Sequence, residues 1–367
     1  MPSISVGEVK PGSKIIKDVV TPLGGVLFTK GKIILPRDIE ILQAFLIQQI
    51  EIEGAQGENK APETAKAATK QPTPVKARSL INESQLAKTN SPLHDEYEKM
   101  MALVKKSYAS AAAAQLPMLE LRSQLETLIS HLKDYHVLKF APRVLFEQDY
   151  NYHKSVLSAL TSYKIAQWCG QPQKDWMQTA FAGLLHDIGN VKVDASLLQK
   201  PTPLTADEID EVRRHTTYGY QLLRNVTAIN EGVRLAALQH HEKIDGSGYP
   251  LRLEGSQIHI YAKIVAVADI FHAMTLEKAY RKAQSPYLVL EQLLTESFGK
   301  LDPVIVQTFI QKTTDLYNGT RIRLSDGRHG EIIFTDRSNP TRPMVQVEGI
   351  IVNLMLEREL YIQEIIA

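Results

Sequence analysis

Residues 186–250 contain HDIG at 186–189, an isolated His215 and HHEKIDGSGYP at 240–250. Core packing does not require so many imidazole and carboxylate groups, because a buried polar or charged group without a partner costs several kcal/mol. Imidazole and carboxylate together are ligands for zinc, iron or manganese, and a cluster this rich predicts more than one ion. Two neighbouring ions of this kind indicate hydrolysis of a phosphate ester.

Helical spacing predicts that further candidate ligands face the interior. Asp149 and His153 are four residues apart, which places them on one face of a helix. A capping box at Thr205 predicts the start of another helix, which we expect to continue through residue 222. The candidates on apolar stripes of predicted helices are His215, His240, His241 and Asp269. Bound cations would neutralise such a converging set.

These strings, together with VAVADIFHAMT at 265–275, resemble the HD-GYP subgroup of the HD-domain metal-dependent phosphohydrolases. The resemblance covers residues 146–290. Characterised members of the subgroup hydrolyse the bacterial second messenger cyclic di-GMP to pGpG or GMP. The resemblance implies a phosphodiesterase that uses a metal-activated hydroxide, with two or three iron or manganese ions inside a helical bundle.

The resemblance also implies roles for individual residues. The implied metal ligands are Asp149, His153, His186, Asp187, His215, His240, His241 and Asp269, with Asp187 as the bridging carboxylate. The implied substrate contacts are Lys278, Arg281, Lys282, Gly248, Tyr249 and Pro250, and the implied catalytic residues are His186, Asp187, Lys278 and Arg281. Asp149 stands where members with three ions have a glutamate.

Three positions depart from the family pattern. Asn190 stands in place of the lysine after HDIG, Lys278 in place of an arginine, and His272 in place of an acidic residue. Lysine lacks the bidentate phosphate recognition of arginine. The departures favour a second interpretation, a catalytically weak or inactive receptor that binds cyclic di-GMP or, through the GYP loop, a diguanylate cyclase. A third interpretation is a hydrolase of another nucleotide.

Composition and pattern divide the chain into five segments, and the expected fold class is mainly α. The segments are a small α+β regulatory module at 1–54, a flexible linker at 55–90, a helical connector at 91–145, the HD-GYP bundle at 146–316 and a β-rich module at 317–367. The linker contains no aromatic residue and cannot bury a core. An Ala-rich patch at 109–114 suits either a homodimer interface or support of the bundle, which periodicity does not separate.

The totals exclude several classes of protein. The 42 basic and 41 acidic residues leave a net charge of +1, which provides no field toward nucleic acid or membrane. The single cysteine, Cys169, excludes a disulfide framework and suits a reducing compartment. The sequence has neither an apolar signal-peptide core nor a run long enough to span a bilayer. We therefore expect a cytoplasmic protein.

Overall fold

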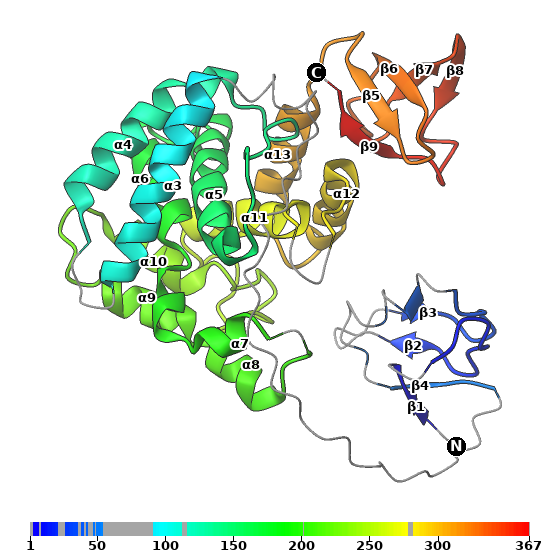
Figure 1. Cartoon of the computed structure of the whole chain (residues 1–367), viewed down its shortest axis with the longest axis horizontal. Helices are drawn as coiled ribbons and strands as arrows, with labels where there is room; N and C mark the ends of the chain where they lie inside the picture. Colours follow the sequence, from blue (N-terminus) through cyan, green and yellow to red (C-terminus); the bar gives the residue numbers. More distant parts are fainter. Residues whose placement is uncertain are drawn as a thin grey trace, which may run out of the picture. The chain divides into compact units, whose positions relative to one another are not determined.

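The computed structural model describes residues 3–6, 9–20, 26–35, 38–39, 42, 47, 49–53, 91–111, 116–200, 202–277 and 282–366. The chain divides into two compact units, Met1–Val75 and Lys76–Ala367, and Figure 1 shows both. The predicted linker and most of the helix expected after Pro36 lie outside the described residues. No helix of the described residues is both long and apolar enough to cross a membrane.

The first unit contains two small antiparallel sheets. Strand β1 (Ser3–Ser5) pairs with β4 (Gln49–Glu51), and β2 (Val19–Val20) pairs with β3 (Val26–Phe28). The turn residues Gly12 and Gly31 have positive φ, which glycine adopts without a steric penalty. Ile15, Ile34 and Leu42 are among the residues that form the core of this unit. The β-rich runs expected from the sequence therefore form a small module.

Helices form the greater part of the second unit, as the sequence predicts (Figure 1). They are α3 (Pro92–Ala111), α4 (Met118–Ser130), α5 (Tyr150–Trp168), α6 (Gln173–Leu185), α7 (Ala195–Leu198), α8 (Ala206–Arg213), α9 (His215–Leu223), α10 (Glu231–Gln239), α11 (Ile260–Thr275), α12 (Pro286–Glu296) and α13 (Pro303–Thr314). Short 3-10 turns are η2 (Leu132–Asp134), η3 (Glu147–Asp149) and η4 (Ile188–Lys192). Helices α3 and α4 share one hydrophobic core with the later helices.

Helix α5 lies at the centre of the bundle. It contacts α3, α6 and α11, and most of its side chains are buried. The closest approach is to α6 at Gly183, where an added Cβ would lie 2.6 Å from the carbonyl oxygen of Ser158. Since any side chain at this position would force the two helices apart, the glycine allows α6 to carry the HD pair toward α5.

The helix predicted from Thr205 is interrupted, which corrects the expectation of one continuous stripe. Thr205 and Glu208 form the predicted capping box at the start of α8. Arg214 then separates α8 from α9, and His215 begins the second helix. His215 and Thr216 are buried while α8 contributes no fully buried residue, so the inward position of His215 depends on α9.

The C-terminal segment forms an antiparallel sheet with the strand order β8-β7-β6-β5-β9. Its strands are β5 (Arg321–Leu324), β6 (His329–Phe334), β7 (Met344–Val347), β8 (Ile350–Asn353) and β9 (Ile362–Ile365). The sequence predicts two strands around a turn at 326–327 and β-like runs at 344–347 and 361–365, but not β8, which pairs with β7 across the turn at Glu348 and Gly349. Ser285 at the start of α12 donates a hydrogen bond to the carbonyl of Ile362, which joins the sheet to the bundle.

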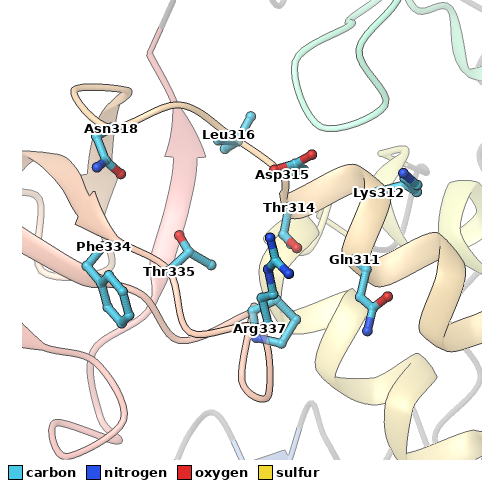
Figure 2. A pocket seen from close by; sticks show the side chains of 10 residues that line it. Gln311, Lys312, Thr314, Asp315, Leu316, Asn318, Phe334, Thr335 and Arg337 are labelled. Carbon is cyan, nitrogen blue, oxygen red and sulfur yellow. The ribbon is translucent and has the colours of Figure 1, made fainter.

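A surface pocket of about 600 Å³ lies where α13 leads into this sheet (Figure 2). Lys312, Asp315 and Arg337 line it together with Phe334. None of its lining residues is a candidate ligand, so this pocket is separate from the histidine cluster.

Candidate metal centre

The HD pair lies where α6 ends and the η4 turn begins. His186 is the C-cap residue of α6 and Asp187 precedes η4, and both side chains are buried. An added Cβ at Gly189 would lie 1.9 Å from the carbonyl oxygen of His215, a contact that no side chain tolerates. Gly189 therefore allows α9 to pack directly on η4, which brings His215 to Asp187.

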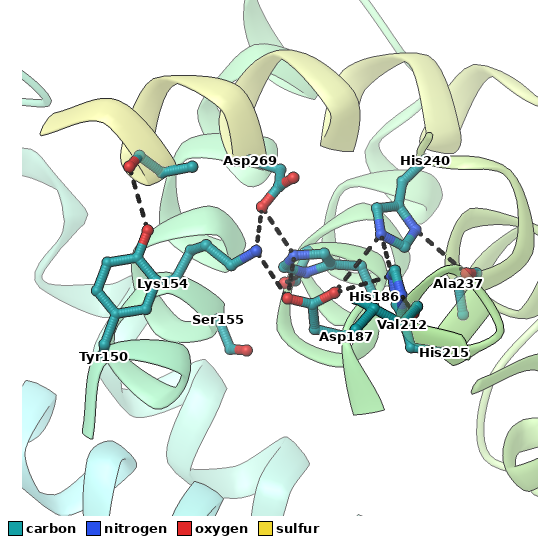
Figure 3. Close-up of polar contacts among 12 residues, drawn as sticks. Tyr150, Lys154, Ser155, His186, Asp187, Val212, His215, Ala237, His240 and Asp269 are labelled. Carbon is teal, nitrogen blue, oxygen red and sulfur yellow. Dashed lines mark hydrogen bonds and ion pairs between the residues drawn. The ribbon is translucent and has the colours of Figure 1, made fainter. Parts of the chain in front are cut away.

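Asp187, His215, His240 and His241 form one group, in which one potential ligand atom from each lies within 4.8 Å of the others. We call it the His-rich group. Oδ1 of Asp187 is 3.4 Å from Nε2 of His215 and 3.6 Å from Nε2 of His240. The two Nε2 atoms are 3.3 Å apart (Figure 3). The predicted convergence of these four residues is thus present.

The chemistry of the His-rich group suits a transition-metal ion. Nδ1 of His215 donates to the carbonyl of Val212 at 2.6 Å, and Nδ1 of His240 faces the carbonyl of Ala236 at 3.0 Å. Carbonyl oxygens only accept, so each ring carries a proton on Nδ1, which leaves Nε2 as the nitrogen available to a metal ion. Two lone pairs and a carboxylate oxygen directed at one point form a donor set for a cation.

Burial keeps the imidazoles of His215 and His241 uncharged at neutral pH. It lowers the pKa of His215 to about 4 and that of His241 well below its usual value. Neutral imidazole is the form that binds metal. The ligands of the His-rich group are therefore ready to bind an ion at pH 7.

His186, Asp187 and Asp269 form a second group. Nδ1 of His186 lies 2.7 Å from the carbonyl of Gly183, and Nε2 lies 3.2 Å from Oδ1 of Asp269. Burial alone would lower the pKa of His186, but the carboxylates of Asp187 and Asp269 raise it. Asp187 belongs to both groups, and its role as a bridging carboxylate stays a prediction.

Lys154, which the sequence interpretation did not select, contacts the second group. Its Nζ lies 2.7 Å from Oδ2 of Asp187 and 2.6 Å from Oδ1 of Asp269, and the side chain is buried (Figure 3). Burial would lower the pKa of Lys154, but the two carboxylates together raise it well above its ordinary value. The sequence did contain a signal for Lys154: it lies on a helix that is buried on nearly every face, and a buried lysine requires an anionic partner.

Asp149 and His153 belong to neither group. Lys105 forms an ion pair with Asp149 at 2.6 Å. The hydroxyl of Tyr97 is 2.8 Å from Nδ1 of His153, and burial lowers the pKa of His153 to about 4. The predicted roles of Asp149 and His153 as ligands stay predictions.

The GYP loop packs against the His-rich group. Buried Glu242 accepts hydrogen bonds from the backbone amides of Leu251 at 2.6 Å and Leu253 at 3.0 Å. The ring of Tyr249 stacks on His241 with centroids 4.8 Å apart, and the guanidinium of Arg213 lies over the Tyr249 ring, 5.1 Å from its centroid. Sequence reasoning gave Glu242 no role, although a buried acid before a glycine-rich loop indicates a loop anchor.

The remaining predicted substrate residues are only partly described. Lys278 and Arg281 lie outside the described residues, and Lys282 is exposed. Asn190 lies in η4 close to the HD pair in sequence. His272 is buried and its Nε2 is 2.7 Å from the hydroxyl of Thr161, so its place is outside both ligand groups.

Comparison with known proteins identifies the domain. A family model described as HD domain matches residues 122–305, half of the chain. The chain belongs to the HD domain family. The mainly α fold agrees with this assignment, as do the two His and Asp groups that could hold metal ions.

Relatives of this HD domain protein are phosphodiesterases of cyclic dinucleotides. A cyclic di-GMP phosphodiesterase of Pseudomonas aeruginosa is 31% identical over 222 residues, which cover 60% of this chain and 53% of that protein. One of Thermotoga maritima is 34% identical over 194 residues, which cover 52% and 51%. A 3'3'-cGAMP-specific phosphodiesterase of Vibrio cholerae is 32% identical over 154 residues, which cover 42% and 30%.

The matched region spans about half or less of these relatives' own length. The cyclic di-GMP phosphodiesterases among them confirm the resemblance of this HD domain to the HD-GYP subgroup.

Proposed function

We propose that this chain is a metal-dependent phosphodiesterase that hydrolyses cyclic di-GMP to pGpG or GMP. The observation that carries the proposal is the His-rich group, where two imidazole Nε2 atoms and Oδ1 of Asp187 lie 3.3–3.6 Å from one another. A transition metal held there supplies a hydroxide nucleophile at neutral pH by lowering the pKa of a coordinated water. The relatives' activity on cyclic dinucleotides supports the choice of substrate class.

The chain's own residues supply orientation and charge. The backbone carbonyls at Val212 and Ala236 fix the rings of His215 and His240 so that their Nε2 atoms face Asp187. The Tyr249 ring restricts rotation of His241 by stacking on it. Arg213, which pairs with Asp210 at 3.1 Å, adds a cation beside the GYP loop that would attract an anionic phosphodiester.

The proposed roles follow from these contacts and from the resemblance. We assign metal binding to the His-rich group, and consider His186 and Asp269 as further ligands. We assign substrate contact to the loop residues Gly248, Tyr249 and Pro250, and phosphate binding to Lys278, Arg281 and Lys282.

The test is turnover by the full chain, purified without oxygen and loaded with Mn²⁺ or Fe²⁺. We expect hydrolysis of cyclic di-GMP, and loss of turnover by about 10²–10³-fold in Asp187→Asn, the range for removing one charge-stabilising group. Asp194→Asn is the matched control, since Asp194 caps α7 and asparagine preserves the cap. Intact cyclic di-GMP with metal-loaded wild type would contradict the proposal.

A second candidate substrate is 3'3'-cGAMP, which relatives from Vibrio cholerae hydrolyse by name. The two dinucleotides share the phosphodiester ring and differ in one base. A competition assay with both substrates measures the ratio of kcat/KM, and a ratio above about 10 for 3'3'-cGAMP would reverse the assignment.

A receptor without turnover is the other candidate function. Asn190 favours it, because the lysine that the resemblance implies at this position is missing. A receptor would bind cyclic di-GMP in a calorimetric titration and release it unchanged. Product formation faster than dissociation would exclude a pure receptor.

A further inference from the structure

The two ligand groups differ in what already neutralises them. In the His-rich group, Oδ1 of Asp187 faces only imidazole nitrogens. In the second group, the ammonium of Lys154 contacts two of the three members at 2.6–2.7 Å (Figure 3). We propose that Lys154 takes the place of a second metal ion, so that this chain holds one transition-metal ion, in the His-rich group. The inference rests on the proposed metal-dependent function.

The Lys154 ammonium and a second metal ion cannot both lie between Asp187 and Asp269. An ion shared by Asp187 and Asp269 would lie about 2.0–2.2 Å from their oxygens. Nζ of Lys154 already lies between Oδ2 of Asp187 and Oδ1 of Asp269. Two cations cannot share that space, because their repulsion in a buried site is poorly screened.

The position of Lys154 in α5 explains why the ammonium remains there. The residue is the fifth of a helix, and the residues that follow it, Ser155 to Ser162, are all buried. Its side chain is 11% exposed, so moving the ammonium away from both carboxylates would leave a buried charge without a partner. An entering ion would have to displace the Lys154 ammonium, and α5 offers no acidic residue to which that ammonium could move.

A second lysine supports the same conclusion at the position implied for a third ion. Nζ of Lys105 lies 2.6 Å from Oδ2 of Asp149, whose side chain is 8% exposed. The neighbouring His153 directs Nδ1 to Tyr97 and is in neither ligand group. Two carboxylates outside the His-rich group, Asp149 and Asp269, therefore each contact an ammonium.

The experiment counts ions without using hydrolysis. The full chain is reconstituted with Mn²⁺ under anaerobic conditions and desalted, and manganese per chain is measured by mass spectrometry and electron paramagnetic resonance. We expect one ion per wild-type chain and the spectrum of an isolated Mn²⁺. Lys154→Met keeps the length of the side chain and removes its charge, so we expect two ions per chain and the spectrum of a coupled pair.

Lys164→Met is the matched control on the same helix. Nζ of Lys164 donates to the carbonyl of Tyr135 at 2.7 Å and contacts neither carboxylate, so the count should stay at one. Lys154→Gln replaces the methionine variant if that variant does not fold, and it has the same expected count.

Three outcomes would overturn the inference: two ions in the wild type, no ion in the wild type, or a single ion in folded Lys154→Met and Lys154→Gln. The ion count is measured without hydrolysis, so failure of this inference can be distinguished from failure of the proposed function. One ion per wild-type chain with cyclic di-GMP left intact would refute the proposed activity and keep the role of Lys154. Two ions per wild-type chain with rapid hydrolysis would refute the role of Lys154 and keep the proposed activity.

Discussion

The two oxygens of Asp187 lie in contrasting environments. Oδ1 faces the Nε2 atoms of His215 and His240, whose Nδ1 atoms face backbone carbonyls. Oδ2 faces the ammonium of Lys154. The same carboxylate thus requires a cation on one side and already has one on the other. The number of ligand residues therefore does not fix the number of bound ions, because a neighbouring lysine changes the charge balance of the site.

The pKa values of Asp187 and Asp269 show the effect of the neighbouring ammonium. Burial would raise the pKa of both carboxyls, but Lys154 and His186 hold it well below the usual range. Both groups are therefore ionised at neutral pH even before a metal binds. The His-rich side can gain further stabilisation from a cation, whereas the Lys154 side gains little.

The largest expected effect comes from exchanging a histidine on each side of Asp187. His215→Gln removes a member of the His-rich group. We expect its metal affinity to fall by more than about a hundredfold, because loss of a group that only orients a metal ligand already lowers affinity by about 10–100-fold. His186→Gln affects the Lys154 side, and we expect it to retain the ion. Calorimetric titration with Mn²⁺ measures both variants.

Equal loss of Mn²⁺ affinity in the two variants would contradict the difference between the two sides of Asp187, because both sides would then contribute ligands to bound ions. Unfolding by urea, measured without metal, provides the control that each variant is folded before its affinity is compared.

A glycine pair tests how the backbone forms the His-rich side. Gly189→Ala places a Cβ 1.9 Å from the carbonyl oxygen of His215, and we expect a loss of about 3 kcal/mol in the free energy of unfolding together with weaker metal binding. Gly219→Ala is the matched control in α9. Its Cβ would meet the Cβ of Ala237 at 3.4 Å, an ordinary contact, and we expect a change within about 1 kcal/mol. Equal unfolding curves for the two variants would contradict this packing.

The inward faces of the helices could be predicted from sequence because burial follows helical period. Asp269 lies with Ala262, Val265 and Ala266 on the buried face of α11, as expected. The capping box at Thr205 was likewise a local signal, formed by residues three apart. Membership of the HD family followed from a string whose spacing is specific, and the comparisons confirm it.

The partners of the inward side chains could not be predicted in the same way. Lys154 meets Asp187 and Asp269 only because α5, α6 and α11 pack together, and these residues are far apart in sequence. The break at Arg214 was missed because the apolar spacing continues across it. Strand β8 was missed because Ile350, Ile351 and Val352 are consecutive apolar residues, without the apolar–polar alternation that indicates a half-buried strand.

The buried His272 allows a pH test of the Lys154 side. Burial, which outweighs the attraction of Asp269, lowers its pKa to about 3. The unfolded chain binds this proton near pH 6.5, so stability falls with falling pH between about 6.5 and 3 and no further below that window. His272→Gln should reduce the slope of unfolding free energy by about 1.4 kcal/mol per pH unit between pH 6 and 5.

Urea unfolding at several pH values measures this slope. The same slope in the variant and the wild type would mean that His272 is protonated in the folded state, and then a second cation besides Lys154 would lie near Asp269. The expected result leaves Lys154 as the cation that compensates this carboxylate.

The smallest expected effect concerns His153, which Tyr97 holds outside both ligand groups. Tyr97→Phe removes the hydroxyl that contacts Nδ1 of His153, and we expect a loss of about 1 kcal/mol in unfolding free energy with no change in Mn²⁺ affinity. If His153 were a metal ligand, the hydroxyl would orient it, and its loss would weaken binding about 10–100-fold. Parallel urea and Mn²⁺ titrations of the variant therefore decide whether His153 belongs with the neutral His-rich side or stands apart from both sides of Asp187.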